Sequence, residues 1–76
     1  MSKWAEIRND NYDVEERCIC IDAWQTLNGN EEGKVIAKVY IDEAKVEYLD
    51  EDARTDVYAQ EIIDEAVRDK YEGYYR

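Results

Sequence analysis

The fold is decided by the most apolar and β-branched stretch of the chain, which reads Lys34-Val35-Ile36-Ala37-Lys38-Val39-Tyr40-Ile41. β-Branched and aromatic residues favour extended structure, in which successive side chains point to opposite faces. This alternation predicts one face made of Val35, Ala37, Val39 and Ile41, and a second face made of Ile36, Lys38 and Tyr40. We therefore expect a strand that is covered on one face and flanked on both edges.

Three other segments show the same period of two and predict neighbouring strands: Trp4–Arg8, Arg17–Trp24 and Val46–Leu49. In the second of them Ile19, Ile21 and Ala23 share the face that we expect to lie on the core. The segments between them carry turn residues, Asn9–Asp13 and the Asn28-Gly29 pair. Charged residues along Val46–Leu49 are typical of an exposed edge strand.

The remainder of the chain predicts one helix that begins at Asp50 or Asp52, either of which can cap it, and ends near Gly73. At 100° per residue its apolar side consists of Tyr58, Ala59, Ile62, Ile63, Ala66 and Val67. The predicted fold class is α+β. It is an antiparallel sheet of about four strands in a meander, with one C-terminal amphipathic helix packed on one face, in a single small acidic domain spanning residues 1–76.

A single helix covers only one face of a sheet, so we expect the second face to be open. That face would carry Trp4, Cys18, Cys20, Trp24, Ile36 and Tyr40. Exposed apolar patches on small proteins usually mark interfaces. The seven Tyr, two Trp and absent Phe support this interpretation, because Tyr and Trp suit half-wet surfaces.

The chain is strongly acidic, with twenty Asp and Glu against ten Lys and Arg and a formal net charge of −10. This charge argues against direct nucleic-acid binding and against anionic membranes, and favours a protein partner with a basic surface. On the outer side of the predicted helix we expect an acidic ridge formed by Glu61, Asp64, Glu65, Asp69 and Glu72. With neither a secretion signal nor a long apolar run, the expected location is cytoplasmic.

Catalytic constellations are scarce, because the chain has no His and Ser2 is its only Ser. Ser–His and Cys–His catalysis are therefore excluded. Asp22, Glu43 and Lys45 resemble the acid and lysine set of metal-dependent nucleases, which gives an alternative as a metal-dependent hydrolase. No stretch matches an EF-hand loop or a glycine-rich phosphate loop, so no cofactor or metal is expected.

The sequence thus favours a non-enzymatic protein-interaction domain. Its sharpest form is a nucleic-acid mimic that inhibits a nucleic-acid enzyme by occupying its basic cleft, as inhibitors from phages and mobile elements do. The predicted partner-binding residues are Trp4, Trp24, Ile36 and Tyr40 with the five acids of the ridge. The alternatives are a homodimer through the sheet face and the metal-dependent hydrolase.

Overall fold

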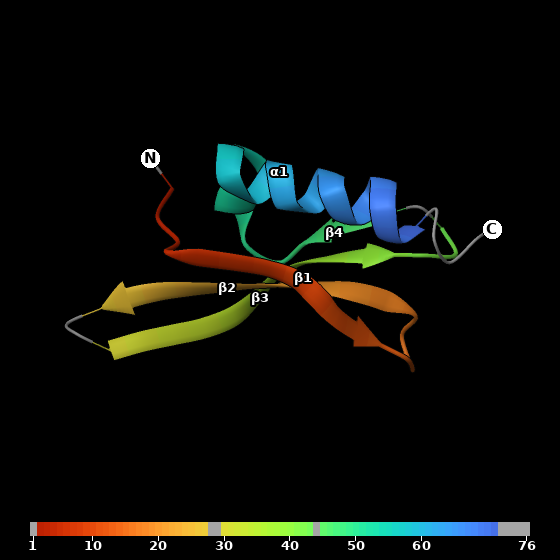
Figure 1. Ribbon diagram of the computed structural model, residues 1–76, viewed down its shortest axis with the longest axis horizontal. Helices are drawn as coiled ribbons and strands as arrows, with labels where there is room; N and C mark the ends of the chain where they lie inside the picture. Colours follow the sequence, from red (N-terminus) through yellow and green to blue (C-terminus); the bar gives the residue numbers. More distant parts are fainter. Residues whose placement is uncertain (1, 28–29, 44, 72–76) are drawn as a thin grey trace.

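The chain forms a four-stranded antiparallel sheet with one helix lying across one face (Figure 1). The computed structural model describes residues 2–27, 30–43 and 45–71, and their side chains except those of residues 26–27, 30–31 and 69–71. The elements, in chain order, are β1 (Glu6–Asp13), β2 (Cys18–Leu27), β3 (Asn30–Tyr40), β4 (Lys45–Tyr48), the 3-10 turn η1 (Glu51–Arg54), α1 (Val57–Glu65) and its π-helical continuation η2 (Ala66–Tyr71).

Each strand pairs with the next one along the chain, in the order β1-β2-β3-β4. This confirms the predicted meander and the α+β class. In Figure 1, α1 crosses above the sheet, and the end of β2 and the start of β3 extend past the beginning of the helix. None of the helices among the described residues combines the length and apolar character that a membrane crossing requires.

The first strand is longer than predicted and absorbs the segment predicted as a turn. Asn9–Asp13 belongs to β1, and the chain reverses instead at residues 14–17, where Arg17 adopts a left-handed φ of 55°. The ladder to β2 is irregular between Arg8 and Asn11. Polar residues are tolerated here because β1 is an edge strand, and Asn9 donates from Nδ2 to the Ile62 carbonyl of α1 at 3.2 Å.

A β-bulge in β3 overturns the predicted division of that strand into two faces. Ala37 lies opposite Ile21 and Val35 lies opposite Asp22, so Ile36 has no counterpart on β2. An extra residue in one strand shifts the side-chain alternation by one position. Ile36 is consequently fully buried beneath the helix with Ala37 and Val39, while Val35 falls on the outer face opposite Asp22.

The core lies between the sheet and the helical segment. The sheet contributes Ile7, Ile19, Ile21, Ala23, Ile36, Ala37 and Val39, the turn after β3 contributes Ile41, and the helical segment contributes Ala53, Ala59, Ile63 and Ala66. Trp4 also belongs to this cluster, with 4% of its surface exposed. The predicted apolar side of the helix is confirmed, because Tyr58, Ile62 and Val67 pack against the same cluster.

The exposure predicted for the second face was wrong for Trp4, Cys18, Cys20 and Ile36, all of which are buried. Trp4 and Ile36 are in the core because of the bulge and of the path taken by the N-terminal segment. The two cysteines do lie on the outer face, but their short side chains sit on the central strand β2, between β1 and β3. Larger neighbours on those strands can cover them.

The helical segment also begins differently from the prediction. Asp50 caps only the short turn η1, where it accepts from the Asp52 backbone N–H, and α1 starts at Val57 with Asp56 as its N-cap. The Asp56 carboxylate accepts from the Ala59 N–H at 3.0 Å. The predicted end near Gly73 lies outside the described residues.

Gly33 on β3 lies directly opposite Trp24 on β2, on the outer face of the sheet. A Cβ atom at Gly33 would lie 2.4 Å from Nε1 of Trp24. The Arg8 guanidinium lies 5.3 Å from the centre of the Trp24 ring. Gly33→Ala must displace this ring, so we expect it to lower the free energy of unfolding by about 1–2 kcal/mol in urea titrations. In a Trp24→Ala background the same substitution should cost little, and an equal loss in both backgrounds would contradict the packing described.

Candidate functional site

The outer side of α1 carries three exposed carboxylates, Glu61, Asp64 and Glu65, which together form the acidic helix face. Their spacing of three and four residues places them on one side of the helix, about 5–6 Å apart. Ala59 and Ile63 are buried against the sheet and fix this orientation. The other two acids of the predicted ridge cannot be placed, because the Asp69 side chain and Glu72 lie outside the described part of the structure.

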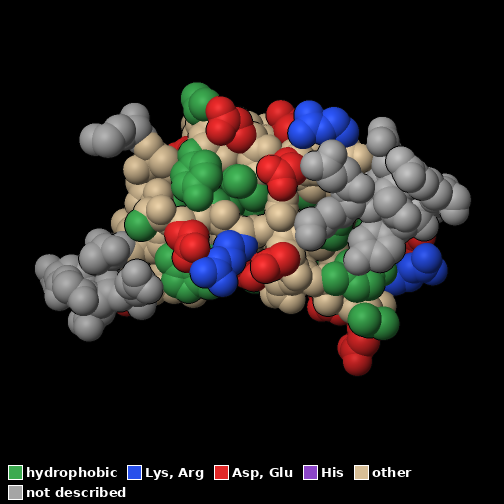
Figure 2. Space-filling view, viewed as in Figure 1, with side chains coloured by type: hydrophobic (Ala, Val, Ile, Leu, Met, Phe, Trp, Pro, Cys, Tyr) green, Lys and Arg blue, Asp and Glu red, His purple; other side chains and the backbone are tan. Residues whose placement is uncertain are grey.

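The edge strand β1 lies beside the acidic helix face. Asn9 Nδ2 contacts both the Ile62 carbonyl at 3.2 Å and Glu65 Oε1 at 3.5 Å, so α1 and β1 adjoin here. Asp10, the next residue of β1, is exposed. Figure 2 shows acidic side chains spread over this face between apolar and basic ones, rather than as one unbroken band.

The basic side chains of the chain are largely tied to its own acids. Within the described residues six of them form ion pairs at 2.7–3.1 Å: Lys3 with Asp52, Arg8 with Glu6, Arg17 with Asp42, Lys34 with Asp50, Lys38 with Glu16, and Arg54 with Glu51. By contrast, no described cation forms an ion pair with Glu61, Asp64 or Glu65. These three carboxylates therefore contribute unpaired negative charge on one side of the helix, together with exposed acids elsewhere such as Glu15 and Glu43.

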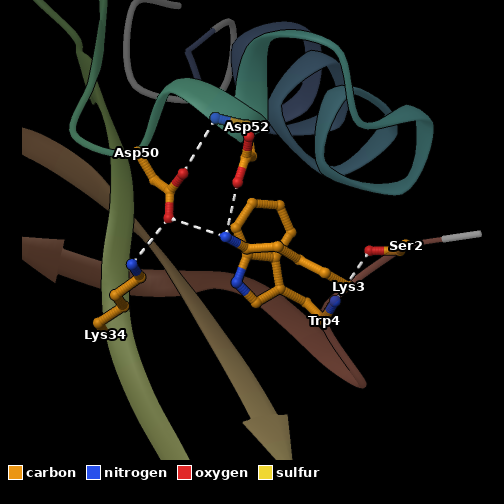
Figure 3. Close-up of polar contacts among 6 residues, drawn as sticks. All are labelled: Ser2, Lys3, Trp4, Lys34, Asp50 and Asp52. Carbon is orange, nitrogen blue, oxygen red and sulfur yellow. Dashed lines mark hydrogen bonds and ion pairs between the residues drawn. The ribbon is translucent and has the colours of Figure 1, made fainter.

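Asp50 is the centre of the most developed polar network (Figure 3). Its Oδ2 lies 2.7 Å from Lys34 Nζ and 3.6 Å from Lys3 Nζ, and its Oδ1 accepts from the Asp52 N–H at 3.0 Å. The carboxylate thereby joins β3, the N-terminal segment and η1. The hydrogen bond from Lys34 is the main cause that lowers the pKa of Asp50, with help from the Asp52 N–H and the charge of Lys3.

The sequence indicates Asp50 as a helix cap but contains no signal for this network. Lys34 reaches Asp50 because the bulge at Ile36 places Lys34 on the helix side of the sheet, and nothing in the local sequence announces that shift. Lys3 comes from the far end of the chain. Its Nζ also lies 5.0 Å from the centre of the Trp4 ring.

The predicted aromatic docking surface is not continuous. Trp24 and Tyr40 are both half-buried on the outer face, but Trp24 lies opposite Gly33 and Tyr40 lies opposite Cys18. Six residues of β2 separate these two positions, which corresponds to about 20 Å. Trp4 and Ile36 are in the core, so of the predicted aromatic and aliphatic docking residues only two reach the surface, at separate places.

Cys18 and Cys20 are free thiols on the same face of β2. Burial raises the pKa of Cys18 to about 11, and the neighbouring Cys20 and Glu16 act in the same direction. Burial also raises the pKa of Cys20. Since the thiolate is the nucleophile and the metal ligand, both groups are poorly suited to either role at neutral pH.

The three residues of the hydrolase alternative are not brought together. Asp22 lies on β2 and accepts a hydrogen bond from Asn11 Nδ2 at 3.1 Å, while Glu43 is exposed in the β3–β4 turn. Lys45 lies opposite Tyr40, five residues along β3 from the partner of Asp22. Among the described residues no three Cys, Asp or Glu side chains are grouped to hold a metal ion.

A small hollow of about 110 Å³ lies beside Trp4, lined by Trp4, Ala23, Gln25, Glu32, Gly33 and Lys34. The Trp4 indole N–H is buried and has no hydrogen-bond partner among the described residues. A volume of this size holds roughly three or four water molecules and is below the ~300–1,000 Å³ of ligand pockets. It does not provide room for a cofactor.

The Asp50 network predicts a specific pH dependence. Asp50→Asn keeps an acceptor for the Asp52 N–H but loses the charge that pairs with Lys34, so we expect a loss of about 1 kcal/mol in the free energy of unfolding at pH 7. Because folding lowers the pKa of Asp50 below its unfolded value of ~3.9, the stabilisation is present above that value and disappears as the pH falls through the folded pKa.

Urea titrations from pH 7 to pH 3 measure this difference. The gap between the wild type and Asp50→Asn should begin to narrow below about pH 4 and shrink further towards pH 3, whereas Glu61→Gln, the matched control without an ion pair among described residues, should show little effect at any pH. A gap that stays constant down to pH 3 would show that the charge of Asp50 contributes nothing.

Comparison with known proteins identifies no relative of this chain. No family model, no curated protein and no solved structure matches the chain.

Proposed function

We propose that this protein is a small non-enzymatic interaction domain that binds a basic surface of another protein through its acidic helix face. The observation that supports this is the distribution of charge. Six basic side chains are engaged by acids of the same chain, while Glu61, Asp64 and Glu65 project from the helix without an ion pair among the described residues. A basic partner is the complement that such a surface attracts.

The sharpest form of the proposal is a nucleic-acid mimic that occupies the basic cleft of a nucleic-acid enzyme. The helix holds its carboxylates at fixed spacing, because the Asp56 cap and the buried Ala59 and Ile63 fix both its start and its orientation. A partner that normally neutralises phosphates offers Lys and Arg side chains in a groove. Inhibitors carried by phages and mobile elements are the class of protein that this describes.

The cellular setting that fits the proposal is a reducing cytoplasm. Both cysteines are free, and their parallel direction on one face of β2 does not suit a disulfide between them. Free thiols persist where glutathione and thioredoxin keep cysteines reduced. Nucleic-acid enzymes with basic clefts work in the same compartment.

A decalysine peptide gives a defined probe for the proposed surface. We expect isothermal titration calorimetry at 50 mM NaCl to detect binding that weakens steeply at 300 mM NaCl, because exposed charges are screened. The variant Glu61→Gln/Asp64→Asn should weaken binding at low salt by about twofold to thirtyfold, because each exposed charge pair contributes about 0.2–1 kcal/mol.

The matched control is Glu15→Gln/Glu43→Gln, which removes the same charge from exposed positions outside the helix. This control should retain most of the affinity. An equal loss in both variants would mean that only overall net charge matters and that the helix face has no special role. If the partner is a nucleic-acid enzyme, mimicry requires that duplex DNA or RNA displace this protein from the basic cleft of the enzyme. Simultaneous binding of the protein and the nucleic acid would contradict mimicry.

A further inference from the structure

The first half of β3, which includes residues 32–35, is an open sheet edge. β3 runs from Asn30 to Tyr40, but β4 pairs only with Ala37–Tyr40. Beyond this ladder the Ile36 carbonyl accepts from the N–H groups of Leu49 and Asp50, at 2.9 Å and 3.1 Å. In the part of the chain that the structure describes, no strand pairs with residues 32–35 on the side away from β2.

Such an edge presents the backbone N–H and C=O groups of alternate residues to any strand that approaches it. Natural proteins often protect edges with charged side chains. Here, however, the charges have opposite signs on either side of Gly33, because Glu32 precedes it and Lys34 follows it. Glu32 lies opposite Gln25 and Lys34 opposite Ala23, so both point to the helix side of the sheet.

This arrangement is complementary to itself. If two identical strands pair antiparallel about a two-fold axis at Gly33, Glu32 of each copy lies directly opposite Lys34 of the other. Directly opposed side chains in an antiparallel pair have Cβ atoms about 4.5–5.5 Å apart, within reach of an ion pair. The register therefore produces two favourable charge pairs and no like-charge pair at these positions.

We propose that two copies of this chain associate by pairing their β3 edges antiparallel across Gly33, which joins the two sheets into one. This interface is separate from the acidic helix face and goes beyond the proposed function. It also differs from a dimer through the sheet face, which the structure does not favour because Trp24 and Tyr40 are far apart.

The local environment permits the pairing. Lys34 is bound to Asp50 at 2.7 Å, yet 56% of its side chain is exposed, and an ammonium group has three donors with which to serve both carboxylates. Each chain carries a net charge of −10, but repulsion between exposed charges is screened over about 8 Å at physiological salt. The paired segment is short, so the dimer is weak and depends on concentration.

Complementation between two charge variants tests this interface by sedimentation velocity in 150 mM NaCl. The wild type should show a monomer–dimer equilibrium as concentration increases. Glu32→Lys alone opposes Lys to Lys, and Lys34→Glu alone opposes Glu to Glu, so each should weaken association by at least about tenfold. An equimolar mixture of the two variants should restore the dimer, because each Lys then lies opposite a Glu.

The matched controls are Glu43→Lys and Lys45→Glu, which make the same charge changes at exposed positions. These positions lie at the Tyr40 end of the β3–β4 ladder, away from residues 32–34. Both should dimerise as the wild type does. A wild type that stays monomeric at all concentrations, or a dimer that is indifferent to the changes at residues 32 and 34, overturns the proposal.

Amide hydrogen exchange of the unaltered protein provides a test that depends on no variant. Protection of the backbone at residues 32–35 should rise with protein concentration, because the added strand bonds to these groups. Exchange that is independent of concentration across the range where dimers form overturns the proposed edge.

Discussion

The architecture depends on one backbone irregularity, the β-bulge at Ile36. The extra residue turns Ile36 into the core beside Ala37 and directs its carbonyl to the N–H groups of Leu49 and Asp50. The same shift brings Lys34 to the helix side of the sheet, where its ammonium meets the Asp50 carboxylate. The ladder between β3 and β4 stops beside the bulge. Residues 32–35 of β3 therefore have no neighbouring strand among the described residues on the side away from β2.

Much of the fold could be predicted because the relevant signals are local. The period of two in the segments around Ile21, Val39 and Val46 predicts strands, and the period of 3.6 around Ile63 predicts the helix and its buried side. Short connections then favour the meander that the structure shows. Asp56 is an equally local signal for the start of α1, but Asp50 and Asp52, which precede it, are equally good candidates for the N-cap from sequence alone.

The remainder depends on how strands pair, which local sequence does not specify. Ile36 is as apolar as its neighbours, so nothing marks it as the residue without a counterpart on β2. Strict alternation then assigned it to the wrong face and predicted an aromatic patch that the structure divides. Likewise, the turn propensity of Asn9–Asp13 is overridden, because the Asn9 side chain finds a partner on α1.

The candidate functional surfaces follow from the same geometry. Internal ion pairs engage most of the described basic side chains, so the acids of α1 remain on the surface without an ion pair among the described residues. The unpaired edge of β3 at residues 32–35 lies elsewhere in the sheet. It presents backbone N–H and C=O groups, and Glu32 and Lys34 give it a charge pattern that is complementary to itself. The two surfaces share no residue, so binding to a basic partner does not require the loss of self-association.

The central claim is that Ile36, and not Val35, points into the core, and a matched pair of lysine substitutions tests it most directly. Urea unfolding should show that Ile36→Lys lowers the free energy of unfolding by at least about 3 kcal/mol or prevents folding, since it buries a charge. Val35→Lys should cost no more than about 1 kcal/mol, because that side chain lies on the outer face. The opposite ranking, with Val35→Lys the more damaging, would show that β3 alternates without a bulge and would contradict this account.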